Sequence, residues 1–147
     1  MNQQSVTDAA TVEANKRLAV RWLELVSAGD VDELCRMTDA SWTMDGGPPH
    51  LPVGPDGIRA LFATFGEITQ TWQVEDVIAE GDKVVIRATN WCVQDVFFNL
   101  PAAGIEQVFT ATFTFRIEGG MMAEIWRNAD DLGRYFQLGG VLTQQAS

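Results

Sequence analysis

The sequence is short of cysteine, histidine and basic residues. Its 147 residues include 2 cysteines, 1 histidine, and 10 Lys or Arg residues against 20 Asp or Glu residues, so the formal net charge is −10. Nucleic acids and anionic membrane surfaces attract Lys and Arg, and this charge therefore argues against both as partners. A small neutral or apolar molecule is the ligand that such a chain favours.

Long apolar runs are also missing. No stretch approaches the roughly 18 apolar residues that a membrane-spanning helix requires, and the polar residues 1–14 lack the apolar core of a signal peptide. Cys35 and Cys92 have no neighbour at metal-ligand spacing, so we expect two reduced core thiols. These features predict a cytoplasmic protein that needs no membrane, metal or cofactor.

Composition and periodicity predict a single domain. With 46% hydrophobic and 20% charged residues, the chain has a globular balance, and its length suits one domain. We place the domain at residues 12–140, after a flexible leader at 1–11 and before a C-terminal tail at 141–147. Apolar spacing predicts helices at 12–27, 31–37, 55–68 and 130–138, and strands at 41–45, 71–80, 83–96, 107–118 and 121–128. Helices followed by an antiparallel meander indicate an α+β fold.

The predicted strand at 107–118 has two different faces. Phe109, Phe113 and Phe115 alternate there with threonines at 110, 112 and 114. A face rich in phenylalanine needs cover from the protein's own helices, whereas a threonine face can pack against a second copy of the sheet. The sequence therefore predicts a homodimer that forms through the threonine face. The loop at 99–104 is predicted to lie at the mouth of the fold as a lid.

Four stretches carry a family resemblance: SAGDVDEL at 27–34, VGPDGIRALF at 53–62, VIAEGDKVVIRAT at 77–89, and FRIEGGMMAEIW at 115–126 with Asp130 and QLG at 137–139. In these stretches the chain resembles the nuclear-transport-factor-two-like superfamily, and most closely its polyketide cyclases of the nogalonic-acid-ester type. The resemblance implies a cone-shaped, curved, mixed but mostly antiparallel sheet closed by three N-terminal helices, which is a cystatin-like α+β barrel around an apolar pocket. The superfamily holds isomerases, hydrolases, cyclases and binding modules, so residues must decide the function.

Three residues are candidate catalysts through this resemblance. Asp45 falls near the general base of related steroid isomerases, where a carboxylate in an apolar cone moves protons; its alternative role is to cap a turn before Gly46. Asp130 has the cyclase spacing after Trp126, and its alternative role is to cap the last helix. His50, the only histidine, stands on the loop after the first strand, where an exposed bystander is the alternative.

Other positions depart from the related enzymes. The steroid isomerases have an oxyanion-hole tyrosine and acid where this chain has Trp22 and Phe113, which cannot stabilise an enolate. The limonene-type epoxide hydrolases have an arginine and two aspartates where this chain has Arg87, Thr89 and Asn128. These departures argue against steroid isomerisation and against water activation by such a trio.

The predicted substrate-binding positions are mainly aromatic. The chain has five tryptophans, and we place Trp91 and Trp126 on the concave side of the sheet, where aromatic walls supply contact area with few rotors. Glu124 shares the strand of Trp126, with an exposed structural role as its alternative. The predicted set is Trp22, Trp42, Arg87, Trp91, Phe113, Glu124, Trp126 and Asn128.

An aromatic cavity with few acid–base pairs suits a cofactor-independent cyclase that folds a flexible polyketide chain. We expect it to close a ring of a polyketide-derived substrate in natural-product biosynthesis, with a [4+2] closure of the Diels–Alder, indane-forming type as the favoured chemistry. The alternatives are an aldol-type ester cyclase, an epoxide hydrolase or an isomerase that uses Asp45 or Asp130, and a noncatalytic small-molecule-binding module.

Overall fold

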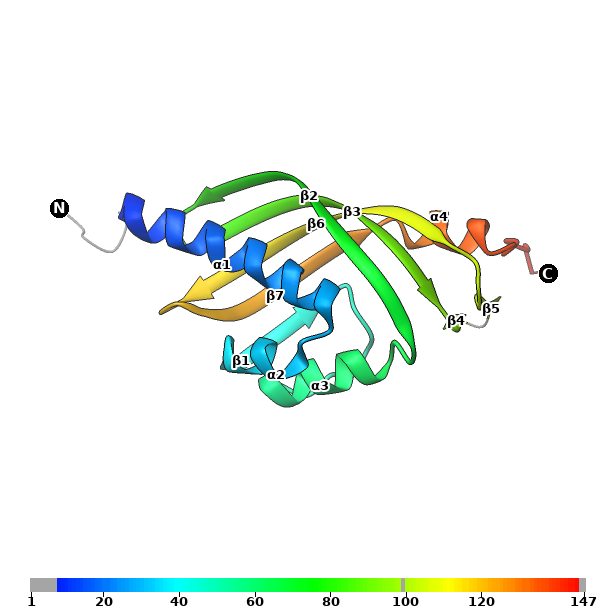
Figure 1. Cartoon of the computed structure of the whole chain (residues 1–147), viewed down its shortest axis with the longest axis horizontal. Helices are drawn as coiled ribbons and strands as arrows, with labels where there is room; N and C mark the ends of the chain where they lie inside the picture. The colour runs from blue at the N-terminus through cyan, green and yellow to red at the C-terminus, as the bar shows by residue number, and fades with distance from the viewer. Residues whose placement is uncertain (1–7, 99, 146–147) are drawn as a thin grey trace.

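The computed structural model describes residues 8–98 and 100–145, and these residues form helices on one side of a curved sheet (Figure 1). The helices are α1 (Ala9–Ala28), α2 (Val31–Arg36), α3 (Pro55–Ala63) and α4 (Asp131–Gln137). The strands are β1 (Thr38–Asp45), β2 (Ile68–Glu80), β3 (Lys83–Gln94), β4 (Val96–Phe97), β5 (Leu100–Pro101), β6 (Gln107–Glu118) and β7 (Met121–Ala129). None of the helices described is long and apolar enough to cross a bilayer.

The five long strands form one sheet in the order β1-β7-β6-β3-β2. β1 pairs with β7 in parallel, and the other neighbours in this sheet are antiparallel. This arrangement confirms the predicted α+β class with a mixed, mostly antiparallel sheet. The sheet stays open, with β1 and β2 at its edges, so the helices and not further strand pairing cover its concave side.

Local sequence signals explain where the first helix begins and ends. The Asp8 carboxylate accepts a hydrogen bond from the Ala10 N–H, so α1 begins at Ala9, three residues before the predicted start. Gly29 ends it with a φ of 69°, a left-handed conformation that glycine reaches at low cost. The predicted leader thus contributes to α1 at its end, and its residues 1–7 lie outside the described chain.

The structure corrects several predicted boundaries, among them the starts of the first two strands, which lie at Thr38 and Ile68 and not at 41 and 71. The third helix ends at Ala63 and not at 68, because β2 already begins at Ile68. The loop predicted at 99–104 contains a short strand, since Val96 pairs with Pro101 and Phe97 with Leu100 in a small hairpin. Asn99, the first residue of the predicted loop, lies outside the described residues.

The core lies between the concave side of the sheet and the helices. Trp22 and Leu23 of α1 pack in one buried cluster with Ile86 of β3 and Phe113 of β6. Trp42, fully buried on β1, belongs to the same cluster. The burial of β6 alternates as predicted, with its phenylalanines buried and Thr110, Thr112 and Thr114 on the outer face.

Candidate active-site cavity

A cavity of about 470 Å³ opens between the concave side of the sheet and helices α1, α3 and α4. Strand alternation directs side chains into it from β2, β3, β6 and β7, while α1 and the loop after β1 complete its walls. Trp72 of β2 packs edge-on against Phe109 and Phe113 of β6, with ring centroids 5.5 and 5.0 Å apart. The aromatic lining consists of Trp22, Phe62, Phe65, Trp72, Phe97, Phe98, Phe109 and Phe113.

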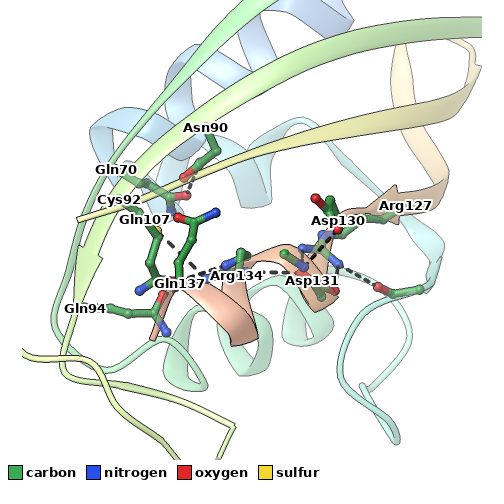
Figure 2. A network of polar contacts seen from close by, with 12 residues as sticks. Gln70, Asn90, Cys92, Gln94, Gln107, Arg127, Asp130, Asp131, Arg134 and Gln137 are labelled. Atoms are coloured by element: carbon green, nitrogen blue, oxygen red, sulfur yellow. Dashed lines mark hydrogen bonds and ion pairs between the residues drawn. The ribbon is translucent and has the colours of Figure 1, made fainter. Parts of the chain in front are cut away.

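A buried arginine on α4 organises the polar end of the cavity (Figure 2). Arg134 is 7% exposed, and its guanidinium carbon lies 3.7 Å from the ring centroid of Phe97 and 4.2 Å from that of Phe109. Its Nε donates to Gln107 Oε1 at 3.0 Å, and its Nη2 donates to Gln94 Oε1 at 3.1 Å. Burial lowers the pKa of this guanidinium from its ordinary value.

Asp131 is the carboxylate of this cavity. Arg127 of β7 holds it with two hydrogen bonds, Nη1 to Oδ2 at 2.8 Å and Nη2 to Oδ1 at 2.9 Å, and Arg134 Nη1 adds a third at 3.3 Å. Burial alone would raise the pKa of Asp131, but the hydrogen bonds and positive charge of Arg127 and Arg134 outweigh it, so the pKa is lowered. Asp131 is therefore an ionised, well-paired group and a weak base.

The loop after β1 fits closely against this ion pair. Arg127 Nη1 also donates to the Gly46 carbonyl oxygen at 3.2 Å. Glycine is required at position 46 for two reasons: a Cβ there would collide with the Arg127 backbone oxygen, and the φ of 82° is unfavourable for other residues. The glycine after β1 thus lets the loop approach β7 and border the cavity.

The inner side of β3 adds neutral polar groups. Asn90, Cys92 and Gln94 alternate along this strand, line the cavity and are buried. Asn90 Nδ2 donates to Oε1 of Gln70 on β2 at 3.1 Å. Burial raises the pKa of the Cys92 thiol, and the nearby Arg134 opposes this only in part, so Cys92 stays protonated near neutral pH.

Two of the eleven predicted site residues line the cavity, namely Trp22 and Phe113. Asp45 is exposed at the end of β1, where Met44 and not Asp45 faces the cavity. His50 is also exposed, with a φ of 63°, and is not among the lining residues. The structure therefore does not bring Asp45 and His50 together with the cavity's polar end.

Asp130 has the role that the sequence offered as its alternative. Its carboxylate Oδ1 accepts from the Gly133 N–H at 2.9 Å and caps the N-terminus of α4. The side chain that lines the cavity is that of the next residue, Asp131. A shift of one residue at the helix start thus separates the capping group from the cavity carboxylate.

The placement of Trp91 and Trp126 on the concave side is wrong. On β3, Asn90 and Cys92 face inward, so Trp91 between them faces outward and is 36% exposed. On β7, the register shifts at Ala123, where Arg116 pairs with Glu124 but Ile117 pairs with Met122. This β-bulge reverses the alternation, so that the residues after it face the cavity at 125 and 127 and not at 124 and 126.

Other predicted binding residues also lie outside the cavity lining. The exposed Arg87 side chain forms an ion pair with Asp76 on the neighbouring strand at 2.7 Å. Glu124 accepts from Arg116 Nε at 3.1 Å. Asn128 is exposed on β7, and Trp42 is buried away from the cavity. The positions compared with the epoxide hydrolases therefore do not converge at this site.

Sequence reasoning missed the polar end of the cavity. Arg127, Asp131 and Arg134 are spaced by four and three residues, as on one face of a helix. The spacing gave no usable signal because Arg127 lies on β7 and the other two residues lie on α4. Asn90 and Gln94 carried no pattern that separates a cavity residue from an ordinary polar one. No cluster of three or more metal-ligating side chains is present in residues 8–98 and 100–145.

Comparison with known proteins places this geometry in context. A family model described as a SnoaL-like domain matches residues 19–125. TsrD from Streptomyces laurentii has a similar structure, with 28% identity, a TM-score of 0.75, and coverage of 92% of this chain and 100% of its own. The search of curated proteins found no match.

Two further solved structures share the fold. A proposed SnoaL-like polyketide cyclase from Jannaschia has 19% identity and a TM-score of 0.78, covering 93% of this chain and 100% of its own. IdmH from Streptomyces antibioticus, a proposed polyketide cyclase, has 21% identity and a TM-score of 0.67, covering 85% of this chain and 98% of its own.

Proposed function

Because the chain belongs to the family of SnoaL-like domains, we propose that it is a polyketide cyclase that closes a ring of a polyketide-derived substrate inside the aromatic cavity. The observation that carries this proposal is the cavity itself, about 470 Å³ in volume, with eight aromatic side chains and one charged end. Similar structures described as polyketide cyclases support the same role. The aromatic walls bind an apolar chain, and the charged end orients it.

The favoured chemistry is an intramolecular [4+2] closure of the indane-forming type. Such a closure joins a diene to an alkene: the three π bonds of the two partners become two new carbon–carbon σ bonds and one new π bond, with no proton transferred and no co-reactant needed. Its main obstacle is the entropy lost when a flexible chain folds onto itself. A rigid wall such as Trp72 packed against Phe109 and Phe113 reduces this loss by holding the chain in a compact conformation.

The charged end favours this chemistry over an aldol closure. An aldol closure requires a base strong enough to remove a proton from carbon, whereas Asp131, the carboxylate that lines the cavity, is a weak base because Arg127 and Arg134 lower its pKa. The two guanidinium groups and the one carboxylate carry a net positive charge. This charge polarises a carbonyl group next to the alkene and makes the alkene more reactive towards the diene.

Two synthetic probes test the proposal. The first is a linear triene tethered to an α,β-unsaturated ketone, and the second is a linear keto ester whose aldol closure requires a base. We expect the protein to accelerate closure of the triene by about 100-fold over buffer and to leave the keto ester unchanged. Chromatography with mass detection follows both reactions, because ring closure of the triene changes retention and not mass.

The same assay separates the alternatives. Asp45→Asn and Asp130→Asn are expected to retain triene closure within about twofold, because neither carboxylate lines the cavity. If the wild type instead accelerates closure of the keto ester and either variant abolishes that acceleration, the result supports an aldol-type cyclase. Tight binding of both probes without turnover would support a noncatalytic binding module.

A homodimer through the outer face of the sheet and a cytoplasmic location are parts of the same proposal. Trp91, Val93 and Val108 are exposed there beside the threonines of β6, which supports packing against a second copy. Cys35 and Cys92 are both unpaired thiols, as suits a reducing compartment. Sedimentation equilibrium at micromolar concentration tests the dimer, and a mass of one chain would refute it.

A further inference from the structure

One amide inside the aromatic cavity has an unused hydrogen-bonding atom. Asn90 is fully buried on the inner side of β3, and its Nδ2 donates to Gln70 Oε1 at 3.1 Å. Its Oδ1 is buried without a hydrogen-bond partner. A buried amide oxygen without a partner is unfavourable unless a ligand supplies one. Figure 2 shows Asn90 and Gln70 with the hydrogen bond that joins them.

Asn90 differs from the other buried polar groups that lack a partner. Within residues 8–98 and 100–145, the buried side-chain atoms without a partner are Trp42 Nε1, Gln107 Nε2 and Asn90 Oδ1. Trp42 and Gln107 do not line the cavity, whereas Asn90 does. Asn90 is therefore the member of this group that borders the cavity.

The surroundings of Asn90 indicate the chemistry of the group that it meets. In the sheet register Asn90 stands opposite Trp72 on one side and Phe109 on the other, so aromatic rings flank it across both neighbouring strands. The partner is thus a polar group on a flat, unsaturated part of the ligand. Because Asn90 Nδ2 is held by Gln70, the atom that remains is an acceptor, which requires a donor on the ligand.

We propose that Asn90, positioned by Gln70, is a specificity-determining residue that accepts a hydrogen bond from a hydroxyl group on an unsaturated part of the substrate. This inference rests on the proposed function, since it describes the substrate of the same cavity. A hydroxyl both donates and accepts, so it satisfies the amide in either of its two orientations.

The charged end gives this substrate a second reference point. Arg134 Nη2 donates to Cys92 Sγ at 3.9 Å and to Gln94 Oε1 at 3.1 Å. These residues lie two and four positions beyond Asn90 on β3. A strand rises about 3.3 Å per residue, so the hydroxyl and the group near Arg134 are separated by roughly 7–13 Å. The substrate class is therefore an elongated unsaturated molecule with a hydroxyl at one point and a carbonyl or carboxylate farther along.

The test compares two bicyclic probes that differ in one group, 2-naphthol and 2-methylnaphthalene, by isothermal titration calorimetry. We expect the wild type to bind 2-naphthol at least about tenfold more tightly, because the unpaired oxygen rejects a methyl group. Asn90→Leu, which removes the acceptor, is expected to lose this preference. Gln73→Leu, the same amide-to-leucine change at an exposed position on β2, is expected to keep it.

Each outcome has one meaning. Equal binding of the two probes by the wild type overturns the role of Asn90 but leaves the apolar cavity in place, and so does a preference that persists in Asn90→Leu. Failure of the wild type to bind either probe contradicts the proposed function itself.

A second measurement needs no variant. In the ¹⁵N-labelled wild type, the Asn90 side-chain amide signals are expected to shift with 2-naphthol and not with 2-methylnaphthalene. Unchanged Asn90 signals in the presence of bound 2-naphthol also overturn the inference.

Discussion

Replacing Arg134 by methionine is expected to lower the free energy of unfolding by about 2–4 kcal/mol. Methionine keeps an unbranched apolar side chain and removes the guanidinium, whose carbon lies 3.7 Å from the ring centroid of Phe97 and 4.2 Å from that of Phe109. Gln107 and Gln94, which are 0% and 7% exposed, lose the donors that now lie 3.0 and 3.1 Å from their amide oxygens. Asp131 keeps both hydrogen bonds from Arg127, so no buried charge is left unpaired.

The magnitude follows from these contacts. Each buried acceptor that loses its donor costs about 1–3 kcal/mol, and the two stacked rings together add roughly 1–2 kcal/mol of lost cation–π attraction. The substitution also removes a buried charge, and this offsets part of the loss because burying an ion costs several kcal/mol. A net loss of about 2–4 kcal/mol remains.

Guanidinium chloride unfolding, followed by tryptophan fluorescence, measures this loss. Arg87→Met is the matched control, because its guanidinium also pairs with a carboxylate, at 2.7 Å, but both side chains are 56% exposed. Exposed pairs contribute about 0–1 kcal/mol. If Arg134→Met is no more destabilising than Arg87→Met, the Arg134 network does not stabilise the cavity in the way described.

Three further predictions concern Asp131, the cap of α4 and the packing of α3. Burial would raise the pKa of Asp131, but Arg127 outweighs burial and lowers it. The ionised Asp131 therefore stabilises the fold above its ordinary pKa of 3.8, and this stability is lost as the pH falls through the lowered pKa. Melting temperatures between pH 7 and 3 should fall more steeply for the wild type than for Asp131→Asn. Asp130→Ala should cost about 1 kcal/mol by circular dichroism melts, and Asp130→Asn close to nothing, since asparagine also caps a helix. Gly57→Ala should destabilise by more than about 2 kcal/mol in urea unfolding, because its Cβ would meet the Trp42 ring at 2.6 Å; a neutral effect would refute this packing.

The fold was largely predictable because its signals are local and regular. Apolar residues alternate with threonines along β6 from Phe109 to Phe115, and the buried and outer faces follow that alternation. Asp30 and Gly29 mark the junction of α1 and α2, since Asp30 accepts from the Glu33 N–H and Gly29 adopts a left-handed conformation. The third helix was predicted too long because Phe65 and Ile68 continue the apolar spacing of α3, although Gly66, with a φ of 60°, separates the helix from β2.

The site was less predictable because its residues oppose simple rules. Trp91 is large and apolar yet faces outward, while its neighbours Asn90 and Cys92 are polar or small and face inward. On β7, the bulge at Ala123 changes which residues face the cavity, and no turn residue marks it in the sequence. Arg127 was missed for this reason, since an unbroken alternation would have directed it outward.

The rate of triene closure by Val26→Trp tests the central claim most directly. Val26 lines the cavity from α1 and is half-buried, so tryptophan there fills the space that the substrate needs without disturbing the sheet. Val53→Trp is the matched control, since Val53 is 59% exposed on the loop before α3. If the aromatic cavity performs ring closure, Val26→Trp keeps its fold by circular dichroism and loses at least about 90% of the acceleration, while Val53→Trp retains it. Equal acceleration by the two variants would contradict the account.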